Sequence, residues 1–63
     1  MAWEIIERKD DATLWRTTDA EGRERYEATR DRDGIAEEPL GVNPVETPEI
    51  AWESYNEDAE IWD

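Results

Sequence analysis

The fold is decided by residues 47–63, TPEIAWESYNEDAEIWD, which combine the start signals of a helix with regularly spaced aromatic side chains. Thr47 suits the N-cap, Pro48 the first helical position, and Glu49 places negative charge where the helix dipole favours it. At about 100° per residue, one face of the helix collects Ala51, Trp52, Tyr55, Ala59 and Trp62. The sequence therefore predicts a helix over 48–62 whose aromatic face packs on another layer.

The first half of the chain is typical of β-structure, because it is rich in Trp, Ile, Leu and Thr or alternates polar and less polar side chains. The candidate strands are WEIIER (3–8), TLWRTT (13–18) and RERYEATR (23–30). Polar turns separate them at KDDA (9–12) and DAEG (19–22), the second suited to a type I turn closed by Gly22 in the left-handed region. These features predict a three-stranded antiparallel meander.

The register of the second hairpin has two solutions. A three-residue loop sets Arg16 opposite Tyr26, whereas a four-residue loop sets Trp15 opposite Tyr26. Pairing of two aromatic residues across strands is favourable, so we expect the four-residue loop, although it also sets Arg16 against Arg25.

A loop connects the meander to the helix. DRDG (31–34) ends the third strand with a turn, and IAEEPLGVNPVE (35–46) contains two Pro and a Gly that exclude a regular helix. We expect an ordered crossing loop in which Leu40 and Val42 or Val45 seal the edge of the core.

The whole chain fits one small α+β domain, because 63 residues are close to the lower size limit of a single core. We divide it into an antiparallel sheet (1–32), a Pro/Gly loop (33–47) and a helix packed on the sheet (48–62). The predicted architecture is a three-stranded antiparallel meander followed by one C-terminal helix.

Negative charge is concentrated in the second half of the chain. The net charge is −12, from 19 acids and 7 bases. Residues 1–36 hold ten acids and all seven bases, whereas 37–63 hold nine acids and no base. Such a surface repels nucleic acid and anionic membranes, so a charged partner is expected to be basic.

Acidic side chains also follow the helical period. Successive intervals of 4, 4 and 3 residues place four Glu along one face, although like charges one turn apart disfavour a helix by a few tenths of a kcal/mol per pair. Salty solvent, neighbouring Arg from the sheet or a basic partner would explain this face. The predicted partner-binding residues, with two at the margins, are Glu46, Glu49, Glu53, Glu57, Asp58 and Glu60.

The sequence offers little for catalysis or cofactor binding. It has neither His nor Cys, and its single Ser, Ser54, has no visible base. DRDGIAEE resembles part of an EF-hand loop, but Leu40 stands where the last carboxylate is needed. We expect no enzyme activity, no cofactor and no metal. The N-terminus lacks a signal-peptide pattern and no apolar run is long enough to span a membrane, so we expect a cytoplasmic protein.

Three resemblances follow from these features. Many acids with a single Lys, over the whole chain, resemble the salt-adapted proteins of haloarchaea. In size and charge the chain is similar to small phage-encoded inhibitors that mimic DNA, including some anti-CRISPR proteins. The order of three strands and then TPEIAWESYNEDA resembles the topology of plant AP2 and integrase-arm DNA-binding domains, but the negative charge is wrong for phosphate, so no direct nucleic-acid binding is expected.

Two hypotheses of function result. The first is a non-catalytic acidic binding or inhibitor module that presents the carboxylate face to a basic protein, one that handles nucleic acid, by nucleic-acid mimicry. The alternative is a small halophile-adapted domain whose acids are salt adaptation.

Overall fold

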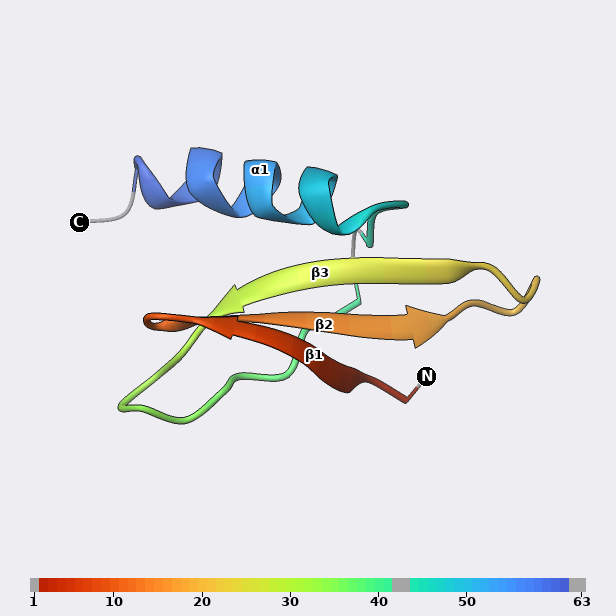
Figure 1. Cartoon of the computed structure of the whole chain (residues 1–63), viewed down its shortest axis with the longest axis horizontal. Helices are drawn as coiled ribbons and strands as arrows, with labels where there is room; N and C mark the ends of the chain where they lie inside the picture. The colour runs from red at the N-terminus through yellow and green to blue at the C-terminus, as the bar shows by residue number, and fades with distance from the viewer. Residues whose placement is uncertain (1, 42–43, 62–63) are drawn as a thin grey trace.

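The computed structural model describes residues 2–41 and 44–61. Its elements are strands β1 (Glu4–Lys9), β2 (Ala12–Thr18) and β3 (Glu24–Arg30) and helix α1 (Pro48–Ala59). The strands form an open antiparallel sheet in the order β1-β2-β3, and α1 lies over the sheet along β3 (Figure 1). The predicted α+β architecture, a meander followed by one C-terminal helix on the sheet, is confirmed.

The predicted turn between β2 and β3 is also confirmed. Gly22 adopts a φ of +84° and its N–H donates to the carbonyl oxygen of Asp19 at 3.0 Å. The Asp19 carboxylate accepts two more backbone N–H groups, from Glu21 and Arg23, each at 2.9 Å. A carboxylate that holds its own turn in this way is the reason Asp is favoured at such positions.

The expected register of this hairpin is wrong. Arg16 lies opposite Tyr26, and Trp15 lies opposite Glu27. The cause is the turn: the Asp19 N–H donates to the Arg23 carbonyl oxygen at 2.9 Å, which leaves a three-residue loop. This register also avoids facing Arg16 with Arg25, and Arg16 instead bonds Glu4 on β1 through its Nε at 2.8 Å.

Alternation along β2 gives the sheet two different faces. Leu14 pairs with Ala28 on the face that carries α1. On that face Ala51 is the buried residue of α1, while Tyr55 and Ala59 are half-buried, in agreement with the predicted core stripe. Trp62, the last predicted member of that stripe, lies outside the described residues.

Trp52 packs on the hairpin of β1 and β2 as part of a mixed cluster. Its ring meets Tyr55 edge-on, with centroids 5.9 Å apart, and the Nζ of Lys9 lies 4.9 Å from its centroid. Its Nε1 donates to Glu7 Oε1 at 3.0 Å. Both the ring and the indole N–H therefore have partners on β1, which fixes α1 across the sheet.

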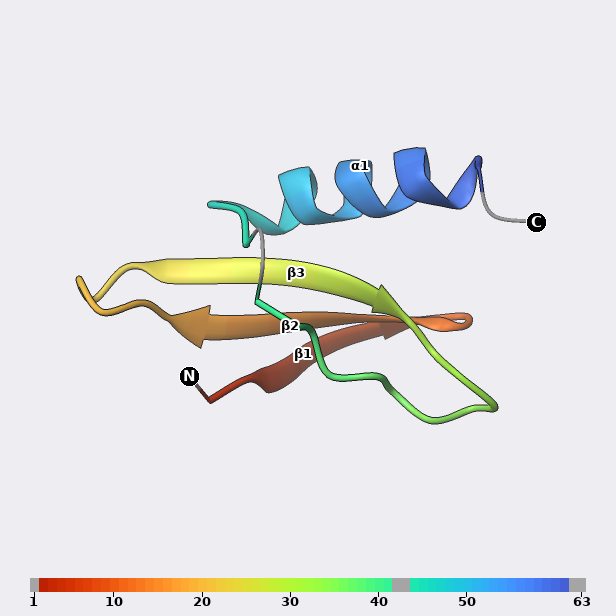
Figure 2. The same ribbon diagram turned by 180° about the vertical axis from the view of Figure 1, so that it is seen from behind.

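The opposite face of β2 is covered by the segment after β3, which crosses in front of β1 and β2 in Figure 2. It starts with a turn in which Asp33 and Gly34 both have positive φ, at +55° and +79°, as a tight two-residue turn requires. Trp15 Nε1 donates to Thr29 Oγ1 at 2.9 Å, and that hydroxyl donates to the Glu37 carbonyl oxygen at 2.6 Å. The hydroxyl thus links the central strand to the crossing segment.

The expectation that Leu40 seals the core is wrong, because its side chain is 89% exposed. Pro39 is the buried residue of the crossing segment. Val45 joins the sheet instead: its N–H and carbonyl oxygen each bond Tyr26 of β3 at 2.8 Å. Val42 lies outside the described residues. Leu40 borders the pocket at the junction of α1 and β3 but stays largely exposed there, which sequence patterns do not specify.

The hydroxyl of Thr29 yields the first prediction. Thr29→Val keeps the shape of the side chain but removes the acceptor of Trp15 and the donor to Glu37, leaving a partly buried indole N–H unpaired. We expect a loss of about 1–3 kcal/mol in the free energy of unfolding. Urea unfolding followed by Trp fluorescence measures it, with Thr18→Val, at the exposed end of β2, as the matched control. Equal losses in both variants would contradict the link.

Candidate protein-binding site

The orientation of α1 is set at its N-terminus. Thr47 is extended and its Oγ1 accepts the Ile50 N–H at 3.1 Å, while Pro48 and Glu49 occupy the first turn, as predicted. At the other end the helix finishes at Ala59, earlier than predicted, and Glu60 still bonds back to Asn56 at 3.3 Å. The helix therefore has a defined rotation about its axis, and one side turns away from the sheet.

Four of the predicted residues share that outward side. Because Ala51 is buried against the sheet, the helical period turns Glu53 and Glu57 outward, with Glu49 and Glu60 beside them. All four side chains are exposed. Within residues 2–41 and 44–61, none of them lies in an ion pair. We call these four carboxylates, Glu49, Glu53, Glu57 and Glu60, the acidic face.

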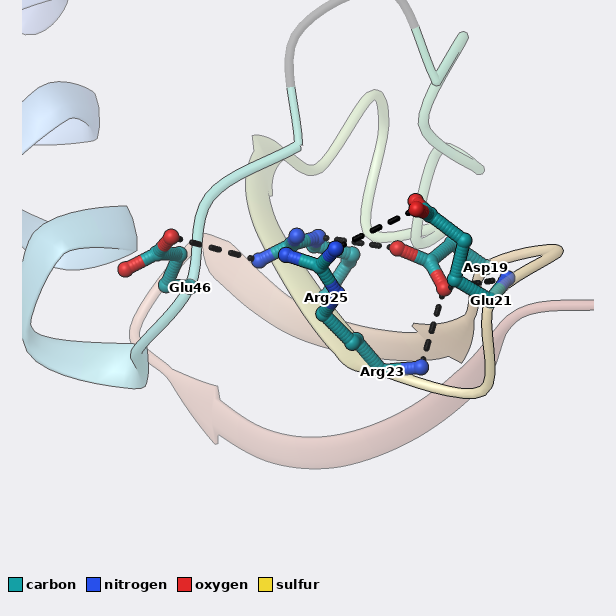
Figure 3. Close-up of polar contacts among 5 residues, drawn as sticks. All are labelled: Asp19, Glu21, Arg23, Arg25 and Glu46. Carbon is teal, nitrogen blue, oxygen red and sulfur yellow. Dashed lines mark hydrogen bonds and ion pairs between the residues drawn. The ribbon is translucent and has the colours of Figure 1, made fainter.

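Glu46 has a structural partner, unlike the acidic face. Its Oε1 lies 3.7 Å from Nη1 of Arg25, whose Nε donates to Asp19 Oδ2 at 3.3 Å. Figure 3 shows the guanidinium between the two carboxylates. Arg25 is only 17% exposed, so the charge needs both partners. The pairing ties the start of α1 to the β2-β3 turn.

The carboxylate of Asp19 is the centre of this cluster (Figure 3). Backbone N–H groups, that of Arg23 first, lower the pKa of Asp19, and the nearby guanidinium groups act in the same direction. The Asp19 carboxylate therefore keeps its charge to a lower pH than an ordinary Asp side chain.

Asp58 is also separated from the acidic face. It follows Glu57 by about 100° around the helix and lines a pocket of about 210 Å³ beside Tyr26 and Tyr55, at the junction of α1 and β3. The structure thus brings four of the six predicted residues together and gives Glu46 and Asp58 different surroundings.

Two residues of the outward side were missed by the sequence reasoning. Ile50 is 44% exposed and Ile61 is 81% exposed, and both lie next to members of the acidic face along the chain. The available signal was their helical position, because neither falls on the arc of Ala51 and Tyr55.

In the folded protein, the uneven charge of the sequence is divided between the sheet and the helix. β1 and β3 are each neutral and β2 carries only Arg16, so the strands sum to +1. α1 carries four acids and no base. The following Arg are in ion pairs with acids that lie outside α1: Arg8, Arg16, Arg23, Arg25 and Arg32. The helix layer therefore presents negative charge that the sheet does not neutralise.

Glu27 is an unusual acid within the sheet. It lies opposite Trp15, and its Oε1 is buried without a hydrogen-bond partner among the described residues. Burial raises the pKa of the Glu27 carboxyl above its usual range. The ionised form is thus unfavourable in the folded protein, and a neutral side chain of the same shape would fit better.

Other kinds of site find little support in residues 2–41 and 44–61. No three acidic side chains there are grouped closely enough to hold a metal ion, and no helix is long and apolar enough to cross a membrane. Comparison with protein-family models, with curated proteins and with solved structures gave no match.

The raised pKa of Glu27 gives the second prediction. Because the folded pKa exceeds the unfolded one, the penalty is complete above the folded pKa and disappears as the pH falls towards the unfolded value. We expect Glu27→Gln to stabilise the protein near neutral pH by roughly 0.5–1 kcal/mol, a small effect because much of the side chain is solvated.

Thermal unfolding of both proteins from neutral to mildly acidic pH measures the effect of Glu27→Gln. The difference should shrink as the wild-type carboxyl takes up its proton. Glu24→Gln, at the exposed start of the same strand, is the control. A Glu27→Gln variant that is less stable than wild type at neutral pH would contradict the assignment.

Proposed function

We propose that this protein is a non-catalytic acidic binding module that uses the acidic face of α1 to occupy a basic surface on another protein. The observation that supports the proposal best is that Glu49, Glu53, Glu57 and Glu60 are all exposed, lie on one side of the helix and have no ion-pair partner among the described residues. Of the other two predicted acids, Glu46 is paired with Arg25, and Asp58 lines the pocket at the junction of α1 and β3.

The spacing and the negative charge of the carboxylates on the acidic face indicate the class of partner. Side chains one helical turn apart have Cβ atoms about 5–6 Å from each other, a repeat comparable to that of phosphates along a nucleic-acid strand. A surface that binds phosphates with Lys and Arg offers the complementary charge. We therefore propose a basic, nucleic-acid-handling partner in the cytoplasm and inhibition by nucleic-acid mimicry, with no direct binding of nucleic acid by this chain.

The third prediction tests the acidic face. The combined variant Glu49→Gln, Glu53→Gln, Glu57→Gln and Glu60→Gln should lose the ability to displace a fluorescent oligonucleotide from folded, basic DNA- or RNA-binding domains, measured by anisotropy. The wild-type protein should displace it at low salt, and displacement should weaken as salt rises, because association of opposite charges is screened.

A matched variant separates the acidic face from net charge. Asp10→Asn, Asp11→Asn, Asp33→Asn and Glu38→Gln remove four exposed acids that lie outside α1. Both variants have the same net charge, so only the position of the removed carboxylates differs. We expect the matched variant to compete nearly as well as wild type. Equal loss in the two variants, or no displacement by wild type at low salt, would contradict the proposal.

Salt adaptation is the second candidate function of the acids. It is favoured by the exposed acids away from α1, such as Asp10 and Glu38, which have no ion-pair partner among the described residues. In this case the acidic surface is a response to concentrated salt, and repulsion between unscreened carboxylates should oppose folding in dilute buffer.

A titration with potassium chloride decides between the two candidates and is the fourth prediction. Under the proposed binding function we expect a cooperative thermal transition and native near-UV circular dichroism already in dilute buffer, with a modest gain in stability as salt screens the like charges. Native near-UV signals from the Trp residues that appear only in molar salt would instead assign the acid excess to the solvent.

A further inference from the structure

We infer that Ile50 and Ile61 are apolar anchors at the two ends of the acidic face, so that the partner surface is a basic groove with apolar contact points. The inference deepens the proposed function and rests on it. It assigns to these two residues the selectivity for a particular protein surface, which carboxylates alone do not provide.

The first observation is the position of Ile50 and Ile61 along the helix. They are 11 residues apart, which corresponds to about three helical turns, so they emerge on the same side of α1. Glu53 and Glu57 lie between them on that side. Ile61 lies two residues beyond the end of α1 at Ala59. The helical turn continues to it, because the Ile61 N–H donates to the Asp58 carbonyl oxygen at 3.1 Å.

The second observation is that the side chains of Ile50 and Ile61 are exposed. Ile61 is 81% exposed and Ile50 is 44% exposed, although the domain is small and has few large apolar residues to bury. The contacts of α1 with the strands are made from its sheet side, by backbone proximity to β2 and β3 and by Trp52 on β1, and no other element of the described chain lies over its outer side (Figure 1). Helix propensity does not explain the choice of Ile at these positions, because Ile is a poorer helix former than the long polar residues.

The chemistry of the partner follows from this combination. Helices that bind in grooves do so through apolar side chains on one side, and Ile50 and Ile61 are two exposed apolar side chains about three turns apart. Charge complementarity requires Arg or Lys along the walls of that groove, since the acidic face has no base. Burial of the Ile side chains adds affinity that salt does not screen, and a groove that contacts only phosphates lacks the matching apolar points.

The experiment uses two fluorescent peptides of equal length and equal Arg content, with Leu or Ser at the same positions. Anisotropy titrations give the affinity of each for the full chain. We expect wild type to prefer the Leu peptide roughly tenfold, which corresponds to about 1.4 kcal/mol. The variant Ile50→Ser with Ile61→Ser should lose most of this preference and bind the Ser peptide as before.

Controls address folding and general stickiness. Ile61→Ser alone lies beyond the last helical residue and should remove part of the preference without changing the thermal midpoint. Ile35→Ser is the matched control, because Ile35 is 71% exposed but lies on the crossing segment rather than on α1. It should keep the full preference for the Leu peptide.

The outcomes separate the two proposals. If the Glu→Gln variant of the acidic face loses affinity for both peptides while the Ile variants keep the preference for Leu, the proposed function stands and the anchors are wrong. If Ile35→Ser reduces the preference as much as Ile61→Ser, the contact is non-specific and the anchors are also wrong. If the Glu→Gln variant binds both peptides like wild type, the proposed function is contradicted, and the inference that rests on it is contradicted as well.

Discussion

The structure depends on covering both faces of one strand. β2 has Ala12, Leu14 and Trp15 buried together with two Thr, so a single seven-residue strand supplies most of the core. One layer on the sheet would leave half of these side chains in water. α1 therefore covers the face of Leu14, and the segment after β3 covers the face of Trp15. In a chain of 63 residues without disulfides, the loop is a structural layer in its own right.

Polar groups join this second layer to the sheet. Asp31 accepts from Thr13 Oγ1 at 2.8 Å and from Arg8 at 2.9 Å, so one carboxylate joins β1, β2 and the start of the crossing segment. These bonds lower the pKa of Asp31, that from Thr13 first. Together with the hydrogen bonds of the Thr29 hydroxyl, they pair the polar groups on this face of the sheet. This face has too little apolar surface for hydrophobic burial alone to hold the second layer. Buried polar groups of this kind favour one arrangement of the loop, because any other leaves them unpaired.

A small number of contacts also holds the charged helix α1 in one orientation. Glu49 is favoured by the helix dipole, but the acids of α1 also repel one another along the outer side. Its position is fixed elsewhere: by the bridge of Val45 to Tyr26, by the pairing of Glu46 with Arg25, and by Trp52 on β1. Because the anchoring contacts lie on the sheet side and at the helix start, the outer side is left exposed. Fold stability and the proposed binding thus use different residues.

The sequence by itself determined the local features: the strands, the turn closed by Gly22, the cap at Thr47 and the spacing of the acidic face. Each depends on neighbours along the chain, through turn chemistry or helical period. Only the tertiary structure decided the register of Arg16 against Tyr26, the burial of Pro39 instead of Leu40, and the separation of Glu46 and Asp58 from the other acids. These features depend on distant partners, such as Arg25 and Val45, whose proximity is set by how the layers close over β2 and by no pattern within a short segment.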